Sequence, residues 1–539
     1  MISFFKKHDY LLPILSGLML GFSWLPYGLP GLIFIAFIPI LWYTLLSVQK
    51  SRKNTAFFLN TFLSFSIFNV ITSWWVMNAG GIIGLLAPVL VNGTVMTFTM
   101  MVYKYLLKKH HKKYIGWSFL AVWLAMEYLH SLDWDLSWPW MFIGYSISEY
   151  NFLYQWYEWV GVRGGSFWII GVNIGFYKWL LSKTESVQKI PNTPYVINTL
   201  FRLFVPITIS LVMFFVDDDK GRSTAQVRIV QPNIDTYTDK FDESKYKSHK
   251  DLFYKLSFSE HEINPDLILL PETALPSGVW EDKIKNSGWI RRFKSEIIRF
   301  KVPMMIVGAS TFRRIEGNIV DPPLSFRKLH DGSFYEAYNT AVCLTADSLS
   351  LYHKSRLVAG VEQLPFAGYM PFLKKLAIDL GGTSGVLGTQ KERTVFKKDS
   401  LRVAPIICYE SVYGEYLSEF IQNGANLIAI ITNDGWWGNT AGHKQHFHYA
   451  RIRAVENKRW IVRSANTGIS GVIDEKGNVI TSLQYDIDGV INHEVELISS
   501  KTFFSKYGDY IGRLSAMTAL YFFLVAYVKK YREQRMIHP

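Results

Sequence analysis

Three polar residues of different chemistry each follow a short apolar run in the middle of the chain. Glu272 stands in the string LILLPETALP, Lys354 in LSLYHKSRLV and Cys408 in RVAPIICYES. In α/β proteins, functional groups gather where strands end. A carboxylate can take the thiol proton, the thiolate can attack a carbonyl carbon, and an ammonium can stabilise the oxyanion that forms. The three residues therefore predict a site for covalent acyl transfer.

Each of the three residues also has a simpler interpretation when it is taken alone. A cysteine at the end of a strand is commonly an inert, buried side chain. Glu272 would suit the start of a helix, and Lys354 would suit a solvated surface. Their occurrence together, in this order and after apolar runs, favours the catalytic interpretation.

The region around these residues alternates apolar runs of strand length with helical segments. Such runs are typical of strands that are buried on both faces. The strand-like runs are Gln226–Gln231, Asp266–Leu270, Pro303–Gly308, Val403–Ile407 and Leu427–Thr432; the helix-like segments include Tyr413–Asn423 and His443–Arg459; and two hairpins are expected, Ala341–Thr345 with Leu349–Tyr352 and Gly468–Ile473 with Asn478–Thr481. This pattern predicts an α/β domain with a mixed sheet.

The flanking regions are much more apolar and predict membrane spans. The chain has 539 residues, 49% of them hydrophobic and 19% charged, and a helix needs about 20 mostly apolar residues to cross a bilayer. We expect residues 1–216 to form a membrane domain with seven spans, 217–508 an external domain, and 509–539 an eighth span with a cytoplasmic tail. No cleavable signal peptide is expected. The eight spans are Tyr10–Trp24, Leu32–Leu46, Ala56–Met77, Ile82–Tyr105, Tyr114–Leu129, Ser166–Leu181, Tyr195–Val216 and Tyr510–Val528.

The basic residues between these spans predict their orientation. With the N-terminus inside, the cytoplasmic loops and span ends hold the basic residues of Lys6–Lys7, Lys50–Lys53, Lys104–Lys113, Lys178–Arg202 and Lys529–Arg535. Because positive flanks stay in the cytoplasm, the external domain is expected on the opposite side of the membrane. The formal net charge of +13 is thus explained by topology, and we expect no nucleic-acid partner.

Cysteine usage is sparse. Cys343 and Cys408 are the two cysteines of the sequence, so no disulfide framework is expected, although a single disulfide between them stays open at this point. Cys343 lies inside a strand-like run and is expected in the core.

The sequence resembles the apolipoprotein N-acyltransferases, the membrane members of the carbon–nitrogen hydrolase (nitrilase) superfamily. The strings that carry the resemblance are YHKSRLVAGVEQLPF, CYES, TNDGWWGNTAGHKQHFHYARIRAVENKRWIVRSANTGISG, SWPWMFIGYS and GVRGGSFWIIGVN, together with the Glu–Lys–Cys order. Two segments depart from the family pattern: Val358–Glu362, and Asp239–Phe241, where relatives often carry a tryptophan.

The resemblance implies a fold, a reaction and a location. The fold is an external αββα sandwich tethered to the membrane spans. Glu272, Lys354 and Cys408 would be the catalytic triad, supported by Glu362, Tyr409 and Glu410. Cys408 would take a fatty acyl chain from a membrane phospholipid as a thioester and pass it to the N-terminal amine of a diacylated apolipoprotein, with no cofactor. A protein of this kind is expected as a monomer in the bacterial inner (cytoplasmic) membrane, with the catalytic domain on the periplasmic side.

Two other functions stay open as alternatives. The first is a membrane-tethered nitrilase-like amidase, which would use the same triad with water as the acceptor; the number of spans argues against it, because a soluble substrate needs no such bundle. The second is a transporter or scaffold with an inactive domain, and the intact Glu272, Lys354 and Cys408 argue against that.

A few further side chains have competing interpretations. Trp436 and Trp437 follow a strand end and are candidates for contact with an acyl chain. His443, His446 and His448 lie close in sequence, but a helix would point His448 away from the other two, so we expect no metal site. Glu127 lies in an apolar stretch, where a carboxylate faces either the bundle interior or the interface.

Overall fold

The computed structural model describes residues 2–109, 115–184, 193–216, 222–258, 264–317, 319–366 and 386–537. It divides into two compact units. The helical unit comprises Met1–Leu132, Trp138–Val216 and Tyr507–Pro539, and the α/β unit comprises Asp133–Ser137 and Asp217–Lys506. The short segment Asp133–Ser137 thus belongs with the α/β unit, although the chain on both sides of it belongs to the helical unit. Lys112, Lys113 and Lys189, which contributed to the predicted orientation, lie outside the described residues.

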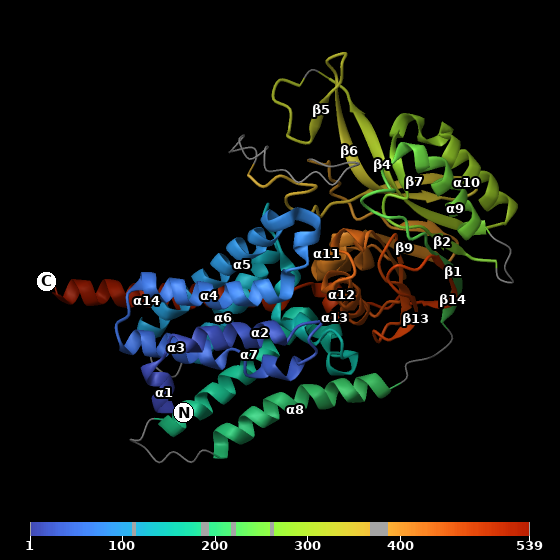
Figure 1. Cartoon of the computed structure of the whole chain (residues 1–539). Coiled ribbons are helices and arrows are strands. Elements are labelled where there is room, and N and C mark those ends of the chain that lie inside the picture. Colours follow the sequence, from blue (N-terminus) through green and yellow to red (C-terminus); the bar gives the residue numbers. More distant parts are fainter. Residues whose placement is uncertain are drawn as a thin grey trace. The chain divides into compact units, whose positions relative to one another are not determined.

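The helical unit consists mainly of long apolar helices (Figure 1). Each predicted span overlaps a helix, although Leu32–Leu46 begins before α3 (Ile38–Gln49) and Ala56–Met77 runs past the end of α4 (Asn54–Ser73); runs of apolar residues satisfy their backbone hydrogen bonds internally when they are helical. The helices are α1 (Ile2–Lys7), α2 (Leu11–Phe22), α3 (Ile38–Gln49), α4 (Asn54–Ser73), α5 (Val76–Lys109), α6 (Ile115–Ser131), α7 (Tyr157–Thr184), α8 (Thr193–Phe215) and α14 (Tyr510–Ile537), with short 3₁₀ turns at Pro30–Phe34, Pro139–Met141, Ile143–Ile147 and Asn151–Leu153.

The lengths and composition of these helices support a membrane protein. Within the described ranges, five helical segments are long and apolar enough to cross a bilayer, and Leu11–Phe22 is a shorter apolar helix. The five segments are Pro30–Gln49, Asn54–Ser73, Val76–Lys109, Pro194–Phe215 and Tyr510–Arg532. The predicted number of eight spans stays a prediction.

Glu127 faces the interior of the helical unit. Its side chain is buried, and its Oε1 accepts hydrogen bonds from Trp123 Nε1 at 3.1 Å and from the backbone N–H of Ile143 at 3.0 Å. Arg163 donates to the Glu127 backbone carbonyl at 3.1 Å. Of the two predicted surroundings for this carboxylate, the structure therefore shows the interior one.

The α/β unit contains two sheets. The first sheet has the strand order β14-β1-β2-β4-β6-β5, with β3 beside β4 and β7 beside β6, and the second has the order β13-β12-β11-β10-β9-β8. The strands β1, β2 and β4 run parallel, as do β9, β10 and β11. The strands are β1 (Ser223–Gln231), β2 (Leu267–Leu269), β3 (Leu275–Trp280), β4 (Met304–Ile315), β5 (Phe326–Lys328), β6 (Phe334–Leu344), β7 (Leu349–His353), β8 (Phe396–Lys398), β9 (Leu401–Ile407), β10 (Leu427–Thr432), β11 (Ile461–Ala465), β12 (Ser470–Ile473), β13 (Val479–Leu483) and β14 (Gly489–Leu497).

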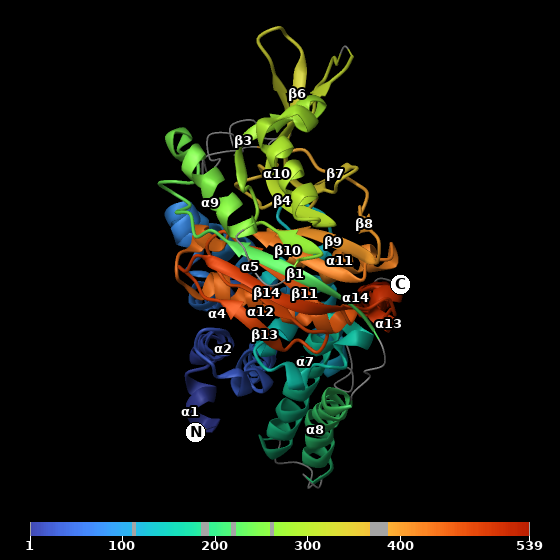
Figure 2. The ribbon, with the colours of Figure 1, turned by 90° about the vertical axis from the view of Figure 1, so that its right-hand side faces the viewer.

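The two sheets pack face to face between two layers of helices. Strand β1 contacts β11 and β12, and β6 contacts β9. Helices α9 (Tyr246–Phe258) and α10 (Gly288–Arg299) cover the first sheet (Figure 2), and α11 (Gly414–Gln422) packs on β9 and on α12 (Ala441–Asn457). The predicted αββα sandwich is therefore confirmed.

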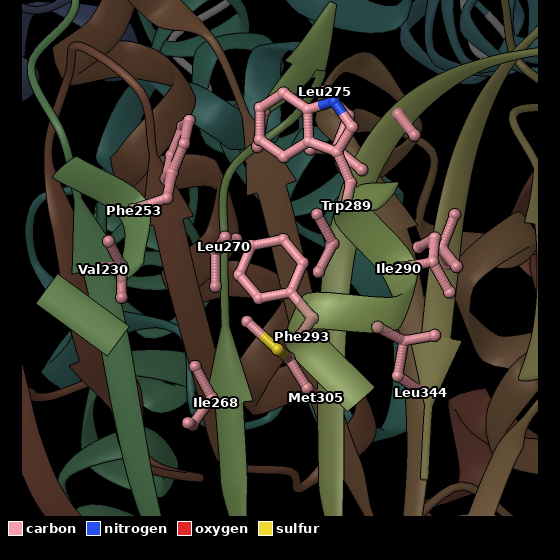
Figure 3. Packing of buried hydrophobic residues seen from close by; sticks show 14 of the residues in the cluster. Val230, Phe253, Ile268, Leu270, Leu275, Trp289, Ile290, Phe293, Met305 and Leu344 are labelled. Carbon is pink, nitrogen blue, oxygen red and sulfur yellow. The ribbon is translucent and has the colours of Figure 1, made fainter. Parts of the chain in front are cut away.

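Burial of apolar side chains explains why α9 and α10 lie on the first sheet. Phe253 of α9 and Phe293 of α10 pack against Ile268, Leu270 and Met305 of the sheet (Figure 3). All of these side chains are almost fully buried, and burying one such side chain contributes about 1.5–3 kcal/mol. Because both faces of the parallel strands are covered, the strands read as continuous apolar runs.

Candidate active site

Cys408 lies at a strained turn immediately after a buried strand. Strand β9 ends at Ile407, and a 3₁₀ turn, Cys408–Val412, follows it. Cys408 has φ +50°, a left-handed conformation that side chains other than glycine adopt rarely and at a cost. Ser411 Oγ donates to the Cys408 carbonyl at 2.8 Å. The turn thus places the thiol at the end of the strand, held by local hydrogen bonds.

Glu272 follows β2 and approaches the adjacent strand closely. The backbone N–H of Gly308 in β4 donates to the Pro271 carbonyl at 3.2 Å. A Cβ at residue 308 would lie 2.4 Å from that carbonyl oxygen and 2.7 Å from Glu272 Cα. Only glycine therefore allows the Glu272 segment to lie this close to β4.

Lys354 follows β7 and places its ammonium between two carboxylates. Its Nζ lies 3.2 Å from Glu272 Oε1 and 2.8 Å from Glu362 Oε1. Asn339 Nδ2 donates to the same two oxygens, at 2.7 and 3.2 Å. Lys354 is 1% exposed and Glu272 6% exposed, so the cluster is shielded from water. The structure brings together Glu272, Lys354 and Glu362, three residues that the sequence singled out.

The charges of this cluster act on the Cys408 thiol. Burial raises the pKa of the thiol well above its usual range, the Glu272 carboxylate raises it further, and the Lys354 ammonium lowers it. The lowering by Lys354 is outweighed by burial and by Glu272, so the net shift of the thiol pKa is upward. Burial alone would lower the pKa of Lys354, but Glu272 and Glu362 hold it well above its ordinary value. Burial and the neighbouring charges therefore favour the neutral form of the Cys408 thiol and the charged form of Lys354.

Glu410 ties the cysteine turn to the lysine segment. Its side chain is fully buried. Glu410 Oε2 accepts from the Ile407 N–H at 2.8 Å, and Oε1 accepts from the Ser355 N–H at 2.7 Å and from the hydroxyls of Tyr352 and Tyr416 at 2.7 and 2.6 Å. Burial raises the pKa of Glu410 and these hydrogen bonds lower it, with a net increase. Glu410 therefore joins the segment that carries Cys408 to the segment that carries Lys354.

Tyr409 points to the segment Asp133–Ser137. Its hydroxyl donates to the Ser137 carbonyl at 3.1 Å. The same segment holds the turn after Glu362, because Asp135 accepts from Gln363 Nε2 at 2.8 Å and from the Phe366 N–H at 2.7 Å. Tyr409 thus helps to hold the segment Asp133–Ser137 within the α/β unit. Its position in the sequence did not indicate this role.

The two candidate tryptophans have different surroundings. Trp436 is partly exposed and packs on Tyr237 and Phe241, with ring centroids 5.4 and 6.1 Å apart. Trp437 packs edge-on against His446, with ring centroids 5.5 Å apart. Both tryptophans are partly exposed, and contact of either with an acyl chain stays a prediction.

Lys240 is a site residue that sequence reasoning missed. It is 3% exposed, and its Nζ donates to the Glu272 backbone carbonyl at 2.9 Å. Burial lowers the pKa of Lys240 to about 7, while the charges of Glu272 and Cys408 act in the opposite direction. The available signal was its place in Asp239–Phe241, which we noted only as a departure from the family pattern.

The three clustered histidines have separate partners. His446 Nδ1 lies 3.0 Å from Asp434 Oδ1, and its Nε2 lies 3.2 Å from the Cys408 carbonyl. His443 Nδ1 lies 3.3 Å from the Gly438 carbonyl, and His448 Nδ1 lies 3.0 Å from Arg451. Among the residues that the structure describes, no three histidine, cysteine or acidic side chains are arranged to hold a metal ion. His446 instead contacts the Cys408 backbone carbonyl.

Both cysteines are free and buried, which answers the open question of a disulfide. Cys343 lies in β6. Burial raises the pKa of its thiol to about 12.

Comparison of the sequence with known proteins shows which family the chain belongs to. Residues 16–175 match the model of the apolipoprotein N-acyltransferase N-terminal domain, and residues 226–501 match the carbon-nitrogen hydrolase model. The apolipoprotein N-acyltransferase of Rickettsia typhi is 30% identical over 413 residues, which is 74% of each chain. The chain belongs to the apolipoprotein N-acyltransferase family. The enzyme of that name from Chlorobaculum tepidum is 28% identical over 533 residues, covering 97% of each chain.

The family match confirms the resemblance that the motifs predicted and the presence of both parts of an apolipoprotein N-acyltransferase. Among solved structures, a mutant amidase of the nitrilase superfamily from Nesterenkonia AN1 is 13% identical, with a TM-score of 0.37, and the match covers 55% of this chain and 98% of that chain.

Proposed function

We propose that this protein transfers a fatty acyl chain from a membrane phospholipid to the N-terminal amine of diacylglyceryl-cysteine apolipoproteins, through a thioester on Cys408. Two lines support the proposal. The relatives that match nearly the whole chain are named apolipoprotein N-acyltransferases. The observation that carries the chemistry is the buried cluster in which Lys354 lies between Glu272 and Glu362 while its charge and that of Glu272 act on the Cys408 thiol.

In the first half-reaction, Glu272 takes the proton of the Cys408 thiol as the sulfur attacks the ester carbonyl of the phospholipid. The C–S bond forms, and Lys354 stabilises the negative charge on the carbonyl oxygen. The C–O bond to the glycerol then breaks, and the alkoxide takes the proton back from Glu272. A lysophospholipid leaves, and the acyl chain stays on the enzyme. Because the thiol is neutral at rest, proton transfer to Glu272 is part of this step and not a prior equilibrium.

In the second half-reaction, the α-amine of the lipoprotein attacks the thioester. Glu272 accepts the amine proton, the C–S bond breaks, and the departing thiolate of Cys408 is reprotonated by Glu272. The α-ammonium titrates near about 8, so a usable fraction is already the neutral amine that attacks, and Glu272 takes the proton that this amine loses as the amide forms. The ester of the donor supplies the free energy of both steps through the thioester, so the scheme uses no cofactor. It predicts ping-pong kinetics.

The proposal includes a location for the reaction. We place the catalytic segment 217–508 on the periplasmic side of the bacterial inner membrane, residues 1–216 and 509–539 in and beside that membrane, and the working unit as a monomer. The support is the one-sided distribution of basic residues between the apolar helices.

Labelled phospholipid tests the proposal directly. Wild-type protein in lipid, incubated with phospholipid that carries a labelled acyl chain, should form an adduct that mass spectrometry assigns to Cys408 and that hydroxylamine removes. Cys408→Ala should form none, and Cys408→Ser should form no hydroxylamine-labile thioester. Cys343→Ala is the matched control and should react like the wild type. Labelling of Cys343 would overturn the assignment, and turnover of small soluble amides at comparable rates would favour the amidase alternative.

A further inference from the structure

A groove in the helical unit has the dimensions and lining of a lipid site. It has a volume of about 500 Å³ and lies between α6, α7 and α8, and α7 and α8 can be followed side by side in Figure 2. Its walls are almost wholly apolar and include Trp117 and Leu120 of α6, Trp168 and Ile174 of α7, and Val205 and Ile209 of α8. None of the described residues that line it is acidic.

Two cations share this groove. Lys178 of α7 and Arg202 of α8 both line it. Helices α7 and α8 approach each other closely next to these two cations: a Cβ on Gly175 would lie only 2.4 Å from Thr199 Oγ1. Lys178 and Arg202 each follow one of these contact residues by three positions, which is less than about one helical turn.

The geometry of the crossing turns the two cationic groups toward each other. Side chains on a helix lean toward its N-terminus. Trp168 Nε1 donates to the Arg202 carbonyl at 2.9 Å. Position 199 of α8 thus lies beside position 175 of α7, and the later position 202 lies beside the earlier position 168, so the two helices run antiparallel. Lys178 and Arg202 therefore lean toward the same level, and their charges lie within electrostatic range of each other. The Lys178 ammonium also packs beside α6, with Nζ 3.6 Å from the position that a Cβ on Gly116 would take.

Two positive charges in an apolar groove are stabilised by a bound anion. Cations inside a membrane segment are costly and normally have a partner, yet no ion pair joins Lys178 or Arg202 to another residue in the described part of the chain. Basic pockets between membrane helices bind the acidic headgroups of lipids. Arginine matches a phosphate with two parallel hydrogen bonds, and lysine adds a compact charge.

We propose that this groove binds an anionic phospholipid, with its phosphate between Lys178 and Arg202 and an acyl chain along the apolar wall. The bound lipid neutralises the two cations and fills the space between α7 and α8. It is a resident lipid and not the acyl donor, so the site does not depend on the thioester mechanism. The predicted orientation puts both cations toward the cytoplasmic end of their helices.

Lipid binding to the purified full-length protein tests this proposal. Delipidated protein is titrated with phosphatidylglycerol, phosphatidylcholine or inorganic phosphate, and bound lipid is counted by native mass spectrometry. Wild-type protein should retain phosphatidylglycerol in preference to phosphatidylcholine. The double variant Lys178→Gln/Arg202→Gln should bind phosphatidylglycerol about 25-fold more weakly, roughly fivefold for each cation removed. The matched control Lys183→Gln/Lys529→Gln loses the same charge outside the groove lining and should bind like the wild type.

Each other outcome would overturn the proposal. Equal retention of the two lipids by wild-type protein would show binding through acyl chains alone. Equal affinity of the double variant for phosphatidylglycerol would place the lipid elsewhere. Protection against thermal unfolding by inorganic phosphate to the same extent as by phosphatidylglycerol would indicate a site for a free anion. The comparison of ligands on wild-type protein keeps the test valid if the double variant fails to fold. A normal rate of Cys408 acylation in a folded double variant is expected, and a lost rate would contradict the separation from the thioester chemistry.

Discussion

Replacement of Glu410 by glutamine should slow thioester formation in a protein that stays folded. The two carboxylate oxygens of Glu410 each face a backbone N–H, from Ile407 on one side and from Ser355 on the other. A glutamine amide keeps the shape of the side chain but carries an NH₂ group in place of one oxygen. Either orientation of that amide puts its NH₂ against a backbone N–H that can only donate.

The magnitude follows from these contacts. Losing one hydrogen bond to a charged acceptor costs about 1.5–3 kcal/mol, against a total stability of about 5–15 kcal/mol for a typical domain. Most of the protein should therefore remain folded. The site is affected more strongly, because Ile407 directly precedes the strained Cys408 and Ser355 directly follows Lys354. A displacement of about 1 Å at reacting groups can cost about 10²-fold in rate.

The assay compares two measurements on the same protein. The rate of labelled thioester formation at Cys408 should fall about 10²-fold in E410Q, and the thermal unfolding transition should persist at a lower temperature. Glu419→Gln is the matched control: this residue lies on α11, its side chain is 45% exposed, and it pairs with Arg393 at 3.0 Å. The control should acylate at the wild-type rate. A folded E410Q that acylates at the wild-type rate would refute the reasoning, and an unfolded E410Q would show that Glu410 holds the whole unit and not the site.

Three further variants test other contacts of the site. G308A places a Cβ 2.7 Å from Glu272 Cα and should slow thiol acylation at least about tenfold in folded protein; an unchanged rate would contradict the close-approach argument. Burial lowers the pKa of Lys240 to about 7, so its ammonium charge is present below that pH and lost above it. K240M should therefore slow acylation most near about pH 6 and least near about pH 9, and a ratio of variant to wild-type rates that is constant with pH would count against a charge effect. D135A removes both hydrogen bonds that hold the turn after Glu362 and should slow acylation about tenfold, measured beside an unfolding curve; a rate within error of wild type would exclude a positioning role.

Much of the fold was predictable because its signals are local. The runs that became β1, β2, β4, β9 and β10 are mostly apolar, since strands covered on both faces bury most of their side chains. The hairpins β6–β7 and β12–β13 were visible because their partners are close in sequence. The apolar spans were predictable for the same reason.

Elements that depend on distant partners were not predicted. Strand β14, GVINHEVEL, alternates polar and apolar residues weakly, and it becomes a strand by pairing with β1 at the other end of the α/β unit. Helix α10 was missed although it buries Trp289 and Phe293, because its charged face dominates its composition. In both cases the tertiary partner supplies the stabilisation.

The sequence by itself determined the kinds of chemical groups and their order along the chain: a carboxylate, an ammonium and a thiol, each after an apolar strand, between apolar helices. Tertiary structure alone decided which of them share one buried space. It put Glu362 and Asn339 on the Lys354–Glu272 pair, brought Lys240 to the Glu272 backbone, and set the thiol pKa above rather than below its usual value. The physical reason is that residue types and hydropathy are properties of the local chain, whereas burial and electrostatic contact depend on residues that are brought together from distant positions.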